Sequence, residues 1–317
     1  MAMEIDPRTG TAVLFPGIGP SSFPDAAKFL LIDAPARELL AHADDVLGYS
    51  LLDAYRTSEE EYGDAARVAF LVTCLALAGW AEKEYGIRPE ICAGASFGGT
   101  PAAVRAGALS FPDAVRLTAQ WGRCIREYFE REHRDVVTQS VARTSPEKIR
   151  AVLAELAEKG EWAEVACRVD DDFFMVSVRE RNVEGLQHRL RAEGSLPLYV
   201  MRPPMHSPAF APLRERVESD VFGGVAFTDP AIPVVSDHDG TVLTTGDGIR
   251  TLLLDATVRQ VHWPEVVATL RRLGVGKAVV AGQDALWGRV GCVTGNFEVV
   301  PVKPTTALRP RRRAAVA

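Results

Sequence analysis

The chain has 317 residues, a formal net charge of −6 and 47% hydrophobic residues. This length suits one large domain or one domain with an insertion, and the composition is ordinary for a soluble globular protein. The negative net charge argues against a general nucleic-acid binder. We also expect no membrane span, because no apolar run approaches the required length, and the N-terminus lacks a signal-peptide pattern.

The cysteine pattern indicates buried thiols. None of the five cysteines forms a CxxC pair, so the sequence predicts neither a metal site nor a disulfide framework. We therefore expect a protein of the reducing cytoplasm. The five are Cys74, Cys92, Cys124, Cys167 and Cys292.

The first part of the chain predicts a strand followed by helices. The apolar run 12–15 leads into the glycine-rich turn 16–20, which is typical of a buried strand entering a loop. Residues 25–85 have helical periodicity. A strand is expected over 87–93, a helix over 100–108, and a further helix from Phe111, where an early proline favours a helix start.

The middle of the chain changes character. Strands are predicted at 136–141, 165–169, 174–178 and 198–200, with helices beginning near Ser145 and at 182–192. This β-α-β-β-α-β order is that of a ferredoxin-like unit. We expect residues 136–200 to form a small ferredoxin-like α+β subdomain. It would be inserted in a large α/β-hydrolase-like domain with a parallel sheet core, formed by residues 1–135 and 201–317, with strands at 232–236 and 274–281.

The pentapeptide Gly94-Ala95-Ser96-Phe97-Gly98 is the strongest functional signal. It has the G-x-S-x-G form of a nucleophile elbow and lies between the strand and the small-residue helix predicted above. The glycines permit a sharp turn that exposes the serine hydroxyl. The sequence therefore predicts that Ser96 is a nucleophile.

A serine nucleophile needs a base and an oxyanion hole. Among the six histidines, His206 stands in an irregular, proline-flanked segment, 203–208. A lone loop histidine is more often a surface residue, so this segment alone leaves both interpretations open. The N–H of Phe97 is the natural first oxyanion donor. The turn at 16–19 offers a second donor, or is an ordinary strand-end turn.

These segments together resemble the malonyl-CoA:acyl-carrier-protein transacylase family, which includes stand-alone enzymes of fatty-acid synthesis and the acyltransferases of polyketide synthases. The resemblance extends over nearly the whole chain. Its motifs are Phe15-Pro16-Gly17-x-Gly19, Gly94-x-Ser96-x-Gly98, residues 107–117, His206-Ser207-Pro208, and the segments 230–236 and 258–263.

The resemblance implies a Ser–His dyad in which a backbone carbonyl orients the histidine. Carried over, Ser96 is the nucleophile and His206 the general base. The carbonyl of Arg259 would orient His206, and the N–H groups of Ile18 and Phe97 would form the oxyanion hole.

The departures from the family's motifs concern the acyl pocket. The family's glutamine, histidine and glutamate near the elbow are replaced by Ile18, Ala95 and Gly99, and its substrate-binding arginine by Trp121. Arginine can hold the carboxylate of a malonyl group in a bidentate salt bridge, whereas tryptophan has one N–H donor and no charge. We expect a larger, less charged pocket formed by Ala95, Gly99, Trp121 and Met205, unless Arg123 or another cation reaches in. The other interpretation is that Trp121 only fills the core.

The resemblance then implies a trans-acting acyltransferase like those of macrolactam polyketide pathways. Such an enzyme would move an aminoacyl or dipeptidyl group between acyl carrier proteins, with no bound cofactor or metal. The phosphopantetheine arm of the carrier would hold the acyl chain. The alternatives are a carrier-protein editing hydrolase, an ordinary malonyl transacylase and a catalytically idle carrier-binding module.

The resemblance also implies the partners. They would be donor and acceptor carrier proteins, and a polyketide synthase loading module is a further candidate; neither nucleic acid nor membrane is expected, and the protein would be a monomer. Because carrier proteins are acidic, Arg150, Arg202 and the basic tail 309–313 are candidate docking residues at the cleft beside the insert. The tail is otherwise a disordered basic end.

Overall fold

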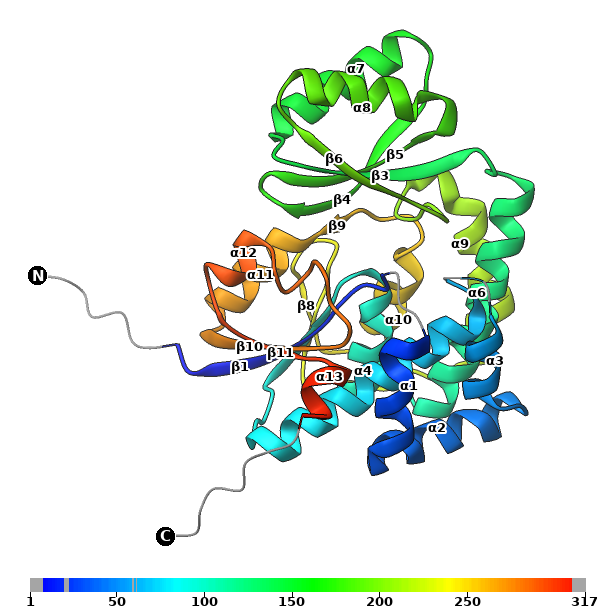
Figure 1. Cartoon of the computed structure of the whole chain (residues 1–317), viewed down its shortest axis with the longest axis vertical. Coiled ribbons are helices and arrows are strands. Elements are labelled where there is room, and N and C mark those ends of the chain that lie inside the picture. The colour runs from blue at the N-terminus through cyan, green and yellow to red at the C-terminus, as the bar shows by residue number, and fades with distance from the viewer. Residues whose placement is uncertain (1–7, 20–22, 59, 61, 310–317) are drawn as a thin grey trace, which may run out of the picture.

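The computed structural model describes residues 8–19, 23–58, 60 and 62–309, and the docking candidates of the tail beyond Arg309 lie outside this range. A six-stranded sheet forms the centre of the larger part, in the order β11-β10-β1-β2-β7-β8 (Figure 1). The five strands from β11 to β7 pair in parallel, and β8 is an antiparallel edge, so the predicted parallel core is confirmed. The strands are β1 (Gly10–Phe15), β2 (Ile91–Gly94), β7 (Val234–Val235), β8 (Val242–Leu243), β10 (Val275–Ala281) and β11 (Glu298–Val302).

Helices cover both faces of this sheet because successive strand residues point to opposite sides. Val13 and Phe15 of β1 belong to the apolar cluster that includes helices α4 and α6. Ala12 and Leu14 belong to a second cluster that includes α11. The helices of the larger part are α1 (Phe23–Ile32), α2 (Ala34–Leu47), α3 (Leu51–Thr57), α4 (Asp64–Tyr85), α5 (Gly99–Arg105), α6 (Phe111–Arg131), α9 (Ala211–Val217), α10 (Gly246–Asp255), α11 (Trp263–Arg272), α12 (Gly291–Thr294) and α13 (Pro304–Ala307).

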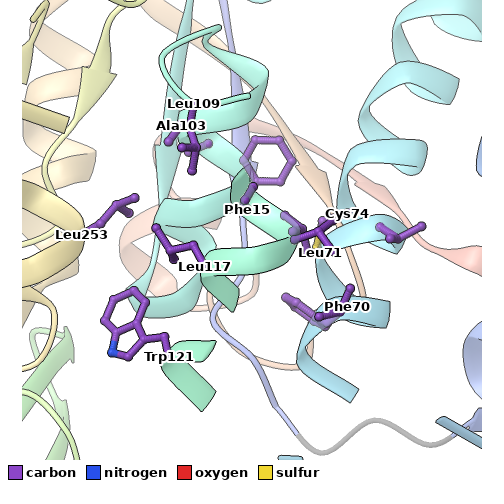
Figure 2. Packing of buried hydrophobic residues seen from close by; sticks show 14 of the residues in the cluster. Phe15, Phe70, Leu71, Cys74, Ala103, Leu109, Leu117, Trp121 and Leu253 are labelled. Atoms are coloured by element: carbon purple, nitrogen blue, oxygen red, sulfur yellow. The ribbon is translucent and has the colours of Figure 1, made fainter. Parts of the chain in front are cut away.

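Helix α4 is the central helix of the first cluster. Contrary to the sequence prediction, α4 is long and apolar enough to cross a membrane, but 72% of its most apolar window is buried inside the protein. Figure 2 shows its Phe70, Leu71 and Cys74 near Phe15 of β1. Such burial is typical of the core helix of a globular domain.

A second, five-stranded sheet lies above the first in Figure 1, with α7 (Pro146–Glu158) and α8 (Val183–Ala192) on its outer face. Its order is β6-β3-β5-β4-β9. The first four strands have the predicted ferredoxin-like succession, and Ser145 caps α7 as expected. The strands are β3 (Val136–Ala142), β4 (Ala163–Asp170), β5 (Phe173–Arg179), β6 (Leu196–Met201) and β9 (Val261–His262).

The fifth strand was not predicted. It comes from a distant part of the chain and pairs in parallel with β4 through Cys167 and Val261. The small sheet is therefore joined to the C-terminal part of the chain by backbone pairing. The domain limits at 136 and 200 stay a prediction.

Candidate active site

The elbow around Ser96 is held by close backbone packing. Ser96 lies just after β2 and has a φ of 52°, in the left-handed region. This conformation is unfavourable for a serine, so the surrounding structure must hold it. A Cβ at Gly98 would lie 2.3 Å from the carbonyl oxygen of Phe15, and one at Gly94 would lie 1.9 Å from that of Gly98. Both positions therefore require glycine: Gly98 because the elbow packs against the end of β1, and Gly94 because the backbone of Gly98 folds back onto it.

The structure brings the predicted dyad together. The Ser96 Oγ lies 2.8 Å from the His206 Nε2, and the His206 Nδ1 lies 3.1 Å from the carbonyl oxygen of Arg259. A carbonyl oxygen only accepts, so Nδ1 carries the proton and Nε2 presents a lone pair to the serine hydroxyl. This is the arrangement that a general base needs.

The His206 loop is fixed by further hydrogen bonds. His206 has φ of 66°, and its N–H donates to the carbonyl of Thr257 at 3.0 Å. The neighbouring Ser207 hydroxyl donates to the carboxylate of Glu164 on β4. The small sheet thus helps to hold the loop that carries the base.

Burial sets the protonation state of His206. It is 5% exposed, and desolvation together with the nearby His238 lowers its pKa to about 3, against the opposing effect of the Arg259 carbonyl. The imidazole is therefore neutral at pH 7 and free to take a proton from Ser96.

Sequence analysis missed Asp237 and His238. The Ser96 N–H donates to the Asp237 Oδ2 at 2.6 Å, and the Asp237 Oδ1 lies 3.5 Å from the His238 Nδ1. Asp237 is buried, which raises the pKa of its carboxyl. Only its position in the sequence could have indicated Asp237. It follows β7, and the carboxyl end of β7 lies beside that of β2 in the parallel sheet.

The two predicted oxyanion donors lie on neighbouring strand ends. Phe15 of β1 pairs with Gly94 of β2, so the turn with Ile18 and the elbow with Phe97 leave the sheet side by side. Ile18 and Phe97 both line the cavity that contains Ser96. Their N–H groups as an oxyanion hole stay a prediction.

A cavity of about 530 Å³ opens at Ser96 between the two sheets. Trp121 and Met205 line it, as predicted, and the small sheet contributes Met175, Tyr199 and Met201. Its walls are mainly apolar. This volume lies within the range of small-molecule binding sites.

Ala95 and Gly99 do not line this cavity, so the prediction that they form the pocket is wrong. Ala95 is fully buried in the cluster that contains α11 on the other face of the sheet. A Cβ at Gly99 would lie 3.1 Å from the Leu253 Cδ2, and Leu253 itself lines the cavity. Gly99 therefore lies behind the cavity wall, next to Leu253, a residue that forms it.

Trp121 is 7% exposed and packs edge-to-face on Phe222 with ring centroids 5.6 Å apart. Figure 2 shows it below Leu117 and Leu253 in the apolar cluster. Its buried Nε1 has no hydrogen-bond partner among the described residues. Trp121 is thus both a core residue and a cavity wall.

A buried arginine also lines this cavity, and sequence analysis missed it. Arg67 of α4 is 9% exposed, and its Nε donates to the carbonyl of Tyr62 at 2.9 Å. The signal was an arginine at the start of an otherwise small and apolar helix. Arg123, the cation considered from sequence, does not line the cavity; its side chain is 56% exposed and lies 3.6 Å from Asp64.

The two docking candidates lie in different places. Arg202 lines the cavity, donates to the carbonyl of Arg134 and pairs with Glu180. Arg150 lies on α7, on the face of the small sheet turned away from the large one, and pairs with Glu147 (Figure 1). The prediction that Arg150 borders the cleft is therefore wrong.

Within the described part of the chain, no group of three or more His, Cys, Asp or Glu side chains is placed to hold a metal ion. Four cysteines are buried and Cys292 is partly exposed. Burial raises the pKa of the Cys92 thiol to about 12. This thiol is therefore not a nucleophile at neutral pH.

Comparison with known proteins agrees with this geometry. A family model described as the VinK acyltransferase small domain matches residues 140–201. The malonyl CoA-acyl carrier protein transacylase of Bacillus subtilis (strain 168) is 28% identical over 301 residues, covering 92% of each chain.

Solved structures show the same fold. A malonyl-transacylase, reported in complex with its type II polyketide synthase acyl-carrier protein, superposes with a TM-score of 0.83 at 24% identity. That match covers 95% of this chain and 98% of the other. FabD from Acinetobacter baumannii also gives 0.83, at 20% identity, covering 95% and 96%. Sequence, fold and site together identify the protein as an acyltransferase related to the malonyl-CoA:acyl-carrier-protein transacylases.

Proposed function

We propose that this acyltransferase moves an acyl group between acyl carrier proteins through an acyl-Ser96 intermediate. His206 takes the proton of the Ser96 hydroxyl as the oxygen attacks the thioester carbonyl, and the thiolate of the phosphopantetheine arm leaves with that proton. The thiol of a second carrier then attacks the acyl-serine while His206 takes the thiol proton, and His206 passes that proton to the departing Ser96 oxygen. The N–H groups of Ile18 and Phe97 stabilise the oxyanion in both steps.

The partner class rests on the comparisons and on the cavity. The transacylase with the matching fold is reported in complex with an acyl-carrier protein. The cavity reaches Ser96 from between the two sheets and has Arg202 in its lining, which suits an acidic carrier that inserts its arm there.

Trp121 carries the proposal for the acyl group. It lines the cavity at the position where the related malonyl enzymes are expected to have the carboxylate-binding arginine. An indole in that place disfavours a short malonyl group, whose carboxylate would lose its salt bridge. We propose a non-malonyl acyl group of the aminoacyl or dipeptidyl type, as in trans-acting enzymes of macrolactam polyketide pathways.

Malonyl transfer from coenzyme A is the second candidate. The names of the curated relatives favour it. Arg67 favours it as well, because it gives the cavity a cation that could compensate for the missing one. Editing hydrolysis shares the same acyl-enzyme and differs only in its acceptor, which is water.

The test compares acyl donors on wild-type protein and the variant Trp121→Arg. Intact-protein mass spectrometry measures the mass gain after mixing with malonyl-CoA or with a dipeptidyl carrier protein. We expect the wild type to load from the dipeptidyl carrier and Trp121→Arg to gain malonyl loading. If wild type and variant load malonyl equally well, the protein is a malonyl transacylase and the non-malonyl proposal is wrong.

A further inference from the structure

The cavity lining contains the charged residues Arg202, Asp284, Arg289 and Lys303 and one buried cation, Arg67, which the proposed chemistry does not use. Arg67 lines the cavity together with Ser96 and Trp121 and is 9% exposed. Desolvation lowers the pKa of Arg67 to about 10, so the guanidinium is still a cation at neutral pH. Because a buried cation without an anion is costly, its surroundings should contain a counter-ion.

The described residues place no carboxylate in direct contact with this guanidinium. No carboxylate of the described residues lies within ion-pair distance of Arg67, and its single hydrogen bond to them runs from Nε to the carbonyl of Tyr62. Asp64 on the same helix favours the Arg67 cation through its charge, but its ion pairs are with Arg126 at 3.5 Å and Arg123 at 3.6 Å. Among the described residues, the two terminal nitrogens of Arg67 therefore have no carboxylate in direct contact, and their donors remain available to a molecule in the cavity.

The position of Arg67 places it beside the acyl pocket wall. A Cβ at Gly122 would lie 3.2 Å from the Arg67 Cδ, so Arg67 crosses α6 at the residue that follows Trp121. The long side chain comes from α4, and it lines the same cavity as the Trp121 indole. A chain attached to Ser96 shares this cavity with both residues.

We propose that Arg67 binds an acceptor oxygen on the distal part of the acyl chain, either an amide carbonyl or a carboxylate. This inference rests on the proposed acyl transfer and deepens it. A planar guanidinium fork suits an oxygen of either kind, and a hydrocarbon chain would leave its donors unpaired. A free ammonium group near Arg67 would be repelled, so the amine of an aminoacyl chain lies elsewhere.

The test uses three pantetheine thioesters of similar length, so that carrier docking plays no part. Glutaryl carries a carboxylate, N-acetyl-β-alanyl an amide, and 5-methylhexanoyl replaces the carboxylate of glutaryl with an isopropyl group of the same shape. The rate of Ser96 acylation is measured by intact-protein mass spectrometry. The proteins are wild type, Arg67→Met, Arg67→Lys and the control Arg116→Met, an exposed arginine of α6 that pairs with Asp113.

We expect wild type and Arg116→Met to prefer at least one oxygen-bearing chain over 5-methylhexanoyl by roughly tenfold or more in kcat/KM. Whichever oxygen-bearing chain is preferred identifies the natural acceptor. Arg67→Met should lose that preference while its rate with 5-methylhexanoyl changes by less than about threefold. Arg67→Lys should retain a preference for glutaryl, because it keeps the charge.

The contrary outcomes are distinct. Equal wild-type rates with all three thioesters would overturn the role of Arg67 and leave acyl transfer intact. A uniform loss in Arg67→Met with all three donors, accompanied by a lower melting temperature, would reduce Arg67 to a structural residue. Failure of every donor, the dipeptidyl carrier included, to acylate Ser96 would refute the proposed function itself.

Discussion

At the residue scale, one buried carboxylate holds the nucleophile in its unusual conformation. Asp237 accepts a hydrogen bond from the backbone N–H of Ser96, whose φ of 52° is unfavourable for a serine. This contact orients the serine hydroxyl toward His206 without touching the reacting atoms. Asp237 is therefore a positioning residue.

Removing that acceptor should slow the reaction more than it destabilises the protein. We expect Asp237→Ala to lower kcat by roughly 10- to 100-fold with little change in KM, since a misplaced nucleophile costs rate rather than binding. Asp237→Asn keeps an acceptor oxygen and should stay within about fivefold of wild type. Steady-state kinetics and melting temperatures of both variants decide this; equal losses in the two would mean that the charge, not the hydrogen bond, matters.

The low pKa of His206 predicts the pH profile. Since burial lowers that pKa to about 3, the base is neutral at neutral and mildly acidic pH. We therefore expect that kcat/KM does not fall as the pH decreases through 6.5, the ordinary pKa of histidine. A bell-shaped profile with an apparent pKa of 6–7 that disappears in a His206 variant would contradict this.

The same shift affects stability, with a defined sign. The unfolded chain binds a proton at this histidine below about pH 6.5, whereas the folded one does so only near pH 3. His206 therefore lowers the free energy of unfolding progressively as the pH falls between these values, and it has no effect above them.

At the scale of elements, the elbow depends on how closely β1 and β2 approach. The carbonyl of Phe15 fills the space where a side chain at Gly98 would begin. The exposed Gly79 in α4, by contrast, has no atom within 4 Å of the position of an added Cβ. Gly98 is therefore the test position, and Gly79 is its control.

We expect Gly98→Ala to destabilise the protein by about 2 kcal/mol or more and to abolish most activity, because the elbow and the turn with Ile18 must separate. Gly79→Ala should stabilise it by about 0.5–1 kcal/mol and leave activity unchanged, since alanine is the better helix former. Urea denaturation and acyl transfer assays measure both. A stable and active Gly98→Ala protein would contradict the described packing.

Elements with strong local patterns could be predicted from the sequence, and those set by distant contacts could not. The G-x-S-x-G turn, the strand β1 and the ferredoxin-like succession follow from local residues. The two-residue strand β9 has no pattern of its own and exists because β4 lies beside it. Asp237 and Arg67 became visible only when the fold placed them beside Ser96 and in the cavity wall, whereas Ala95 and Gly99 lie near Ser96 in sequence but outside its cavity.

At the scale of the whole molecule, the site is formed between two sheets. The base-bearing loop is tied to the small sheet through Ser207 and Glu164, and the cavity takes walls from both sheets. In the proposed function, a carrier protein that delivers its arm approaches this opening, where Arg202 lies.

Two arginines, Arg202 at the cavity and Arg150 on α7, test that approach. Arg202→Glu should raise the apparent KM for a carrier-protein donor by roughly 5- to 50-fold, because it repels an acidic partner, while pantetheine donors are less affected. Arg150→Glu, on the outer face, should leave KM unchanged. Equal effects of both reversals, or none from either, would place the docking surface elsewhere.

The most direct measurement of the central claim is intact-protein mass spectrometry with peptide mapping, after mixing the protein with an acyl carrier donor. Wild type and Ser96→Ala are compared, each with and without a second carrier protein. The account predicts a mass gain on the peptide that contains Ser96, absent in Ser96→Ala, and its transfer to the second carrier. An unmodified Ser96, or acyl loss to water at the same rate with and without acceptor, would contradict it.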